Sequence, residues 1–144
     1  MLTESDVIKA VCRFLTTHGY RVKQHLSESQ TGDDIVAVSP KGKSVMIEAK
    51  GETSSKPHTA RYGKPFNSGQ VLDHVSKAFY RAASYTTKRV LAGIALPRNE
   101  AHMKRVASIQ PVLAKLNVEV FWVRPEDGKV EVAGNWKARP NKAH

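Results

Sequence analysis

The sequence is poor in several features that define large classes of proteins. Its 144 residues include one cysteine, Cys12, which excludes an internal disulfide framework and fits a reducing, cytoplasmic location. No run approaches the roughly 18 apolar residues that a membrane span requires. The first six residues carry two acids and no apolar stretch, which argues against a secretory signal. We therefore expect a cytoplasmic protein with no membrane partner.

Several catalytic patterns are also missing. The six histidines have no zinc-ligand spacing with the cysteine. The sequence contains neither a glycine-rich phosphate loop nor a Gly-x-Ser-x-Gly turn. Cys12 follows Val11 on a predicted helix and is more simply explained as a packing residue than as a nucleophile. Zinc-site, P-loop and serine-hydrolase chemistries are therefore not expected.

Acidic residues are scarce in the second part of the chain. Residues 1–50 carry seven basic and six acidic side chains, residues 51–97 carry seven and two, and residues 98–144 carry nine and five. The formal net charge of +10 thus arises almost entirely after residue 50. Such an excess is typical of proteins with a polyanionic partner, most often nucleic acid, although a basic surface can also serve solubility alone.

The hydrophobic pattern predicts an α/β fold in the order α-β-β-β-α-β-α-β-β. The first helix is expected to be capped by Thr3 and to end at His18-Gly19, and the second to be capped by Ser68. The third helix is expected over residues 99–116, with a break at Pro111 and with these residues inward: Met103, Val106, Ile109 and Leu113. The strands are expected at residues 20–26, 34–38, 44–50, 90–96, 118–123 and 129–133. This order implies a mixed central sheet flanked by helices. We expect one domain over residues 1–134 and a basic tail over residues 135–144.

The predicted hairpin around the turn 39–43 carries the most informative side chains. Glu48 and Lys50 lie two apart on one strand and therefore share a face, while Asp34 begins the partner strand and can lie opposite Glu48. Two converging carboxylates suit a hard cation such as Mg²⁺, and an ammonium beside them can hold a phosphate or position a water. A solvated Glu/Lys pair is the simpler alternative. The apolar run 45–47 favours the metal-linked cluster, because buried charges need partners.

The hairpin motif resembles that of a known superfamily. Gly32-Asp33-Asp34-Ile35, a turn, and Ile47-Glu48-Ala49-Lys50-Gly51 are similar to the PD-(D/E)xK nucleases, which have the restriction-endonuclease-like fold. The resemblance covers roughly residues 3–97 and implies an α-β-β-β-α-β core, here with an added C-terminal helix and hairpin. It implies an endonuclease that uses Mg²⁺, or Mn²⁺, to hydrolyse DNA, leaving a 3′-OH and a 5′-phosphate.

The resemblance also assigns roles to residues. Asp34 and Glu48 would be metal ligands, with the Ala49 carbonyl as a further candidate, and Lys50 would be the catalytic lysine. Asp33 stands where the family has proline, so Asp33 is an alternative ligand, although Asp34 directly precedes the apolar strand as the motif's aspartate does.

Two further residues match family positions on the predicted helices. Glu4 lies on the buried face of the first helix, where many members carry a glutamate that reaches the metal. An ordinary acid favoured by the helix dipole is the alternative. Gln70 matches a glutamine on the helix after the Glu-x-Lys strand that contacts the active site in many members. The alternative for Gln70 is a solvated helix face.

Basic and aromatic side chains near the predicted site form a candidate nucleic-acid surface. On the second helix, spacings of 4, 7 and 11 residues from Gln70 place three side chains on one flank that could follow a phosphate backbone: His74, Lys77 and Arg81. The segment 51–67 has no periodicity, and it adds residues suited to strand contact and stacking: Lys56, His58, Arg61, Tyr62 and Lys64. A solvated helix face and a plain loop are the alternatives.

Three functions are compatible with these residues. The first is the metal-dependent nuclease; its size and layout also resemble archaeal Holliday-junction resolvases, which act as dimers, and a restriction-like or repair nuclease fits equally well. A homodimer could form through Phe121 and Trp122 or the terminal hairpin. The second is a non-catalytic nucleic-acid-binding module on the same fold. The third is an interaction protein whose acids are structural. The gathering of acids near a phosphate surface favours the first.

Overall fold

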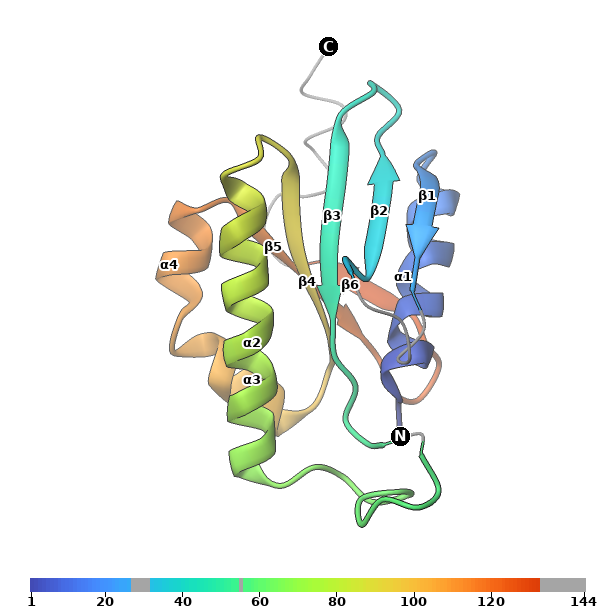
Figure 1. Ribbon diagram of the computed structural model, residues 1–144, viewed down its shortest axis with the longest axis vertical. Helices are drawn as coiled ribbons and strands as arrows, with labels where there is room; N and C mark the ends of the chain where they lie inside the picture. Colours follow the sequence, from blue (N-terminus) through green and yellow to red (C-terminus); the bar gives the residue numbers. More distant parts are fainter. Residues whose placement is uncertain (27–31, 55, 133–144) are drawn as a thin grey trace.

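The protein folds around one mixed β-sheet. The computed structural model describes residues 1–26, 32–54 and 56–132 (Figure 1). The elements are α1 (Glu4–Thr17), β1 (Arg21–His25), β2 (Ile35–Val38), β3 (Ser44–Ala49), α2 (Ser68–Thr86), β4 (Leu91–Pro97), α3 (Glu100–Ala107), α4 (Gln110–Lys115), β5 (Val118–Val123) and β6 (Val130–Val132). The expected α/β class, with a mixed sheet and flanking helices, is confirmed. The predicted tail 135–144 lies outside the described residues.

The six strands lie side by side in sequence order, and β3 is central. β1, β2 and β3 pair antiparallel, β3, β4 and β5 pair parallel, and β6 is antiparallel to β5. Every residue of β3 except Ser44 is buried. The predicted hairpin therefore supplies a strand covered on both faces, and this places Glu48 in the interior of the protein.

The helices cover opposite faces of the sheet. α1 packs on one face, and α2, α3 and α4 pack on the other (Figure 1). Ile35 and Ile47 belong to the core under α1, whereas Val36 and Met46 belong to the core under α2. Because successive strand residues alternate between faces, Asp34 in line with Val36, and Glu48 in line with Met46, face α2. None of the helices in the described part of the chain is long and apolar enough to cross a membrane.

Both long helices begin with a capping box. The Thr3 hydroxyl accepts a hydrogen bond from the Asp6 backbone N–H (3.2 Å) and the Asp6 carboxylate accepts one from that of Thr3 (2.9 Å), as predicted for α1. The prediction that Ser68 caps the second helix is wrong. Asn67 is the cap, because its side-chain oxygen accepts from the Gln70 N–H and Gln70 Oε1 accepts from the Asn67 N–H, both at 2.9 Å.

The predicted helix 99–116 is divided, as Pro111 indicated. α3 ends before Pro111, which falls in the first turn of α4 where no backbone donor is needed. Val106 and Leu113 are buried as expected, and Ile109 is partly buried, but Met103 is 40% exposed and His102 is fully buried in its place. His102 points inward because Asn99 binds both its backbone N–H and its Nδ1, each at 2.8 Å.

The segment after β3 is irregular but firmly attached. The Glu52 carboxylate is buried and accepts hydrogen bonds from the Leu2 N–H (2.7 Å) and from Asn99 Nδ2 (2.9 Å). The Thr53 hydroxyl lies 2.9 Å from the Arg61 carbonyl oxygen and 2.7 Å from that of Lys64. The end of β3, the start of α1 and the start of α3 are thereby tied together beside Lys50.

We predict that Glu52→Ala lowers the free energy of unfolding by on the order of 3 kcal/mol, because it leaves the Leu2 N–H and the Asn99 amide unpaired in a partly buried place. Urea denaturation measures this. Glu100→Ala, which removes an exposed carboxylate from the start of α3, is the control and should cost less than about 1 kcal/mol. Equal losses in the two variants would contradict the role given to Glu52.

Candidate active site

The predicted trio of Asp34, Glu48 and Lys50 meets at one end of the β2–β3 hairpin. Ile35 pairs with Ile47, so the residue before Ile35 lies opposite the residue after Ile47. Asp34 Oδ2 accepts a hydrogen bond from the Ala49 N–H at 2.8 Å, which fixes this carboxylate against β3. Both carboxylates and the Lys50 ammonium are therefore gathered on the α2 face of the sheet.

Glu48 is enclosed by three proton-bearing groups. Its side chain belongs to a residue only 5% exposed, and the Tyr85 hydroxyl donates to its Oε1 at 3.2 Å. Lys50 Nζ lies 3.8 Å from Oε2, and Arg81 Nε lies 3.9 Å from Oε1. Arg81 also donates from Nη2 to the Gly32 carbonyl at 2.9 Å. The hairpin and α2 thus position Glu48 from two sides.

Burial of the two acids disturbs their protonation. Burial, with the charge of Asp34 as a smaller cause, raises the pKa of Glu48 from 4.5 to about 7, although Lys50 and Arg81 act in the opposite direction. Burial also raises the pKa of Asp34, despite the hydrogen bond from the Ala49 N–H. Both carboxyls therefore hold a proton more readily than a free carboxyl does, and a metal cation could replace that proton.

Asp33 and Asp34 occupy different surroundings. Asp34 contacts the backbone of β3 and lies beside Glu48. The Asp33 side chain interacts with the Tyr85 hydroxyl; burial raises the pKa of Tyr85, and the charges of Glu48 and Asp33 add to the effect. The Asp33 carbonyl accepts a hydrogen bond from Gln24 Nε2 at 3.1 Å. Asp34 is therefore the aspartate that pairs with Glu48.

Lys50 lies between two surface pockets. The first, of about 470 Å³, is called the α2 cleft here and is lined by Glu48, Lys50, Ser76, Lys77, Tyr80 and Arg81. The second, of about 400 Å³, is called the loop pocket and is lined by Glu4, Lys50, Gly51, Thr53, Ser54, Lys56, Thr59, Phe66, Gln70 and His74. The structure thus brings Lys77 and Arg81 to one side of Lys50, and Glu4, Gln70, His74 and Lys56 to the other.

The donor set fits a metal ion that needs few protein ligands. Within residues 1–26, 32–54 and 56–132, no three His, Cys, Asp or Glu side chains form a group that could hold a metal, so Glu4 is not gathered with Asp34 and Glu48. Mg²⁺ is commonly held by one or two carboxylates, with waters and substrate phosphates completing its shell. Asp34 and Glu48 are two such carboxylates side by side. Their raised pKa values show that nearby positive charge does not fully offset their negative charge.

Gln70 and His74 differ in how their side chains are used. Gln70 lines the loop pocket, but its Oε1 accepts the Asn67 N–H and helps begin α2. The His74 ring packs edge-on against Phe66, with centroids 4.7 Å apart, and its Nδ1 is buried without a partner among the described residues. Burial and the Lys50 charge lower the pKa of His74, which disfavours the charged imidazolium form.

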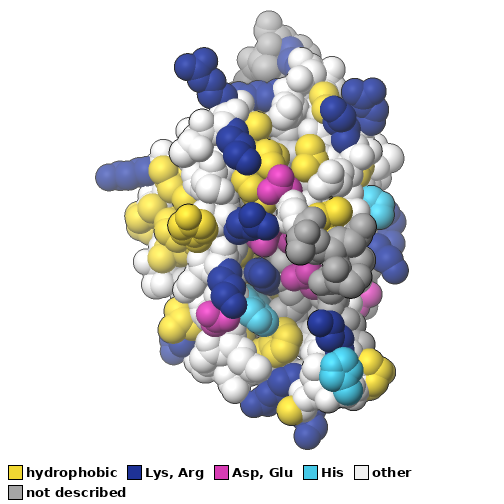
Figure 2. All heavy atoms as spheres, viewed as in Figure 1, with side chains coloured by type: hydrophobic (Ala, Val, Ile, Leu, Met, Phe, Trp, Pro, Cys, Tyr) yellow, Lys and Arg dark blue, Asp and Glu magenta, His cyan; other side chains and the backbone are white. Residues whose placement is uncertain are grey.

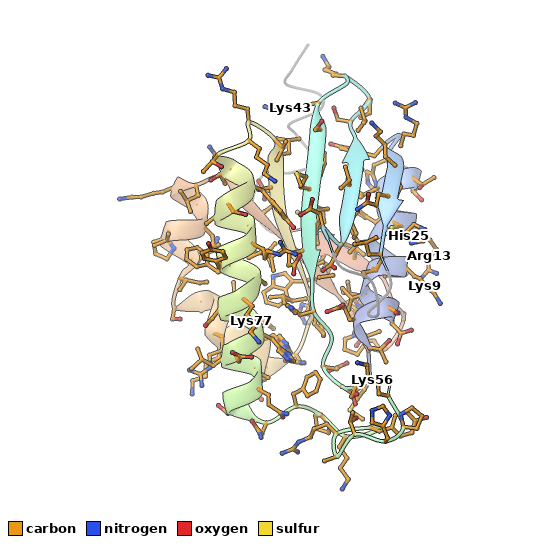
Figure 3. The ribbon with its side chains drawn as sticks, in the orientation of Figure 1. Lys9, Arg13, His25, Lys43, Lys56 and Lys77 are labelled. Atoms are coloured by element: carbon orange, nitrogen blue, oxygen red, sulfur yellow. The ribbon has the colours of Figure 1, made fainter. Side chains whose placement is uncertain are left out.

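The predicted loop residues are only partly brought to the site. Lys56 lines the loop pocket, whereas His58, Arg61, Tyr62 and Lys64 line neither this pocket nor the α2 cleft. The loop projects beyond the end of the sheet, where Lys56 is labelled (Figure 3). Lys and Arg side chains nevertheless lie among the acidic ones across the middle of this face (Figure 2).

Sequence reasoning missed two tyrosines of α2. Tyr85 donates to Glu48, and Tyr80 lines the α2 cleft. A signal for Tyr85 was present, because it follows Arg81 by four residues and so continues the flank of α2 that carries the predicted basic residues. Tyr80 follows Ser76 by the same interval on the neighbouring flank.

No protein-family model matches this sequence, and none of the curated proteins compared with it does either. Any assignment of function therefore depends on the residues and the geometry described above.

The raised pKa of Glu48 predicts a pH-dependent stability. Because the folded protein binds this proton more tightly than the unfolded chain, the stabilisation is complete below pH 4.5 and is lost as the pH rises through about 7. In metal-free buffer, raising the pH from about 5 to about 8 should therefore destabilise the wild type but not Glu48→Gln through this group. The free energy of unfolding of Glu48→Gln, relative to that of the wild type, should rise by on the order of 3 kcal/mol over this range. Denaturation of both proteins at the two pH values measures the gain, and a constant difference between them would refute the assignment.

Proposed function

We propose that this protein is a metal-dependent nuclease that hydrolyses phosphodiester bonds within DNA. The observation that carries the proposal is the pair of buried Glu48 and half-buried Asp34, both with raised pKa values, beside Lys50. A structural role for these acids is a poor explanation, because their pKa values stay raised even with Lys50 and Arg81 nearby, so placing them side by side costs folding free energy. The pair also opens onto the α2 cleft through Glu48, where a polyanion would meet three cationic side chains.

Each residue has a role in this reaction. Asp34 and Glu48 would hold Mg²⁺ or Mn²⁺, which when bound lowers the pKa of a water and stabilises charge on the phosphate. Lys50 donates to the scissile phosphate or to the attacking water from its place between the two pockets. Tyr85 and Arg81 orient the Glu48 carboxylate from α2. Glu4 and Gln70 border the loop pocket on the other side of Lys50.

The arrangement of elements supports the same proposal. The order from α1 to β4 is α-β-β-β-α-β, with β3 antiparallel to β2 and parallel to β4. This is the core order that the PD-(D/E)xK resemblance implies, and the restriction-endonuclease-like fold is part of what we propose. The motif residue Asp34 directly precedes β2, and Glu48 stands on the adjacent strand β3.

The nuclease proposal predicts that Glu48→Ala and Lys50→Ala each lower cleavage of DNA by at least about 100-fold, because each removes a group that stabilises charge at the reacting phosphate. Labelled duplex, single-stranded and branched DNA, incubated with Mg²⁺, Mn²⁺ or EDTA, provide the assay. Lys43→Ala is the matched control, because Lys43 stands at the opposite end of β3 (Figure 3) and should leave cleavage unchanged.

Two outcomes would overturn the proposal. Cleavage that persists in both variants would show that the acids and lysine are not the active site. Salt-sensitive DNA binding by the wild type, with no cleavage under any metal, would instead favour a binding module on the same fold.

The same assay should distinguish the role of Asp34 from that of Asp33. Asp34→Asn is expected to lower metal-dependent cleavage by at least about 100-fold, because Asp34 is the acid adjacent to Glu48. Asp33→Asn should retain most of the activity, because the Asp33 side chain reaches the Tyr85 hydroxyl, whereas Asp34 is the acid beside Glu48. The reverse result would make Asp33 the ligand.

A further inference from the structure

Tyr80 is an aromatic side chain left in solvent at the candidate active site. It is 74% exposed, the largest value among the exposed large hydrophobic residues of the described chain. A single exposed aromatic needs no explanation by itself. Tyr80, however, lines the same α2 cleft as Glu48 and Lys50. Its ring is therefore available to a ligand that approaches the acids.

The α2 cleft has the charge pattern of a phosphate site. Lys50, Lys77 and Arg81 line it together with a single acid, Glu48. Lys77 is labelled on α2 in Figure 3, and its ammonium pairs with Asp73 at 3.0 Å. Both side chains of that pair are more than half exposed, so the pair is weak and a phosphate can compete for the lysine. Lys77 can thus release the Asp73 carboxylate and bind a phosphate in the cleft instead.

The aromatic ring and the cations are adjacent on α2. Lys77 precedes Tyr80 by three residues and so shares a face of α2 with it, and Arg81, the next residue, lines the same cleft. The cleft volume of about 470 Å³ falls within the roughly 300–1,000 Å³ typical of small-ligand sites. A ligand that carries both a flat ring and a phosphate matches these features, and a nucleotide unit has both.

We propose that the α2 cleft binds one unpaired nucleotide of the substrate strand, with its base stacked on Tyr80 and its phosphates near Lys77 and Arg81. In a duplex, both faces of every base are covered by neighbouring bases, so a tyrosine can stack only on a base that has left the helix. The inference rests on the proposed nuclease function and narrows its substrate to strands with unpaired nucleotides beside the scissile bond, such as single strands, flaps or branches.

A binding experiment without metal tests the cleft separately from cleavage. A short DNA strand containing one 2-aminopurine is titrated with protein in EDTA, both as a single strand and as the corresponding duplex, and an RNA strand of the same sequence is included. Quenching of 2-aminopurine reports stacking, and fluorescence anisotropy gives the affinity. The proteins compared are the wild type, Tyr80→Ala, Tyr80→Phe and Leu72→Ala.

We expect Tyr80→Ala to weaken single-strand binding by about 5- to 100-fold and to abolish the quenching, while duplex binding changes by less than about twofold. Tyr80→Phe should retain both affinity and quenching, because the ring remains. Leu72→Ala is the matched control, because Leu72 is exposed on α2 and lines neither pocket, and it should behave as wild type. Equal behaviour of DNA and RNA would mean that the sugar is not read in the cleft.

The inference fails if Tyr80→Ala leaves single-strand binding unchanged, or if it weakens single-strand and duplex binding equally. The two proposals fail separately. A wild type that cleaves duplex DNA but does not depend on Tyr80 keeps the nuclease function and loses the unpaired-nucleotide site. A wild type that stacks a base on Tyr80 but cleaves nothing with Mg²⁺ or Mn²⁺ keeps the site and loses the nuclease function.

Discussion

The placement of half-buried Asp34 beside buried Glu48 is the constraint on which the rest of the site depends. The β2–β3 register places Asp34, directly before β2, opposite Glu48 on β3, and the central position of β3 removes Glu48 from water. The neighbouring Lys50, Arg81 and Tyr85 offset only part of the cost of removing Glu48 from water, because the pKa of Glu48 is still raised to about 7. The fold therefore retains an electrostatic cost that a bound cation would relieve, and such costs are characteristic of functional sites.

The two sides of the site have separate structural supports. On one side, α2 contributes Tyr85 and Arg81 to Glu48 and leaves Tyr80 exposed in the α2 cleft. On the other side, Glu52 connects the start of α1 to α3 and borders the segment that forms the loop pocket. Lys50 belongs to both pockets. A substrate strand that crosses the end of β3 would therefore meet Lys50 between an aromatic, basic cleft and a loop.

The sequence predicted those parts of the molecule that local patterns encode. Alternation and turn residues located the hairpin. Because residues two apart on a strand share a face, the sequence also placed Asp34, Glu48 and Lys50 on one side of it. Features that depend on tertiary packing were not predictable. Asn67, rather than the predicted Ser68, caps α2, because only the three-dimensional turn decides between adjacent polar residues. His102, rather than the predicted Met103, points inward from α3, because Asn99 binds the His102 ring. The burial of Glu52 and the contact of Tyr85 with Glu48 likewise join distant segments.

The most direct test of the account is the proton released when the metal binds. Calorimetric titration of the protein with Mg²⁺ or Mn²⁺, repeated in buffers of different ionisation enthalpy, measures that release. At about pH 6, where the Glu48 carboxyl is largely protonated, binding should release close to one proton, and at about pH 8.5 it should release far less. Binding with no proton release at either pH, or no binding at all, would contradict the claim that the Asp34–Glu48 pair is a metal site.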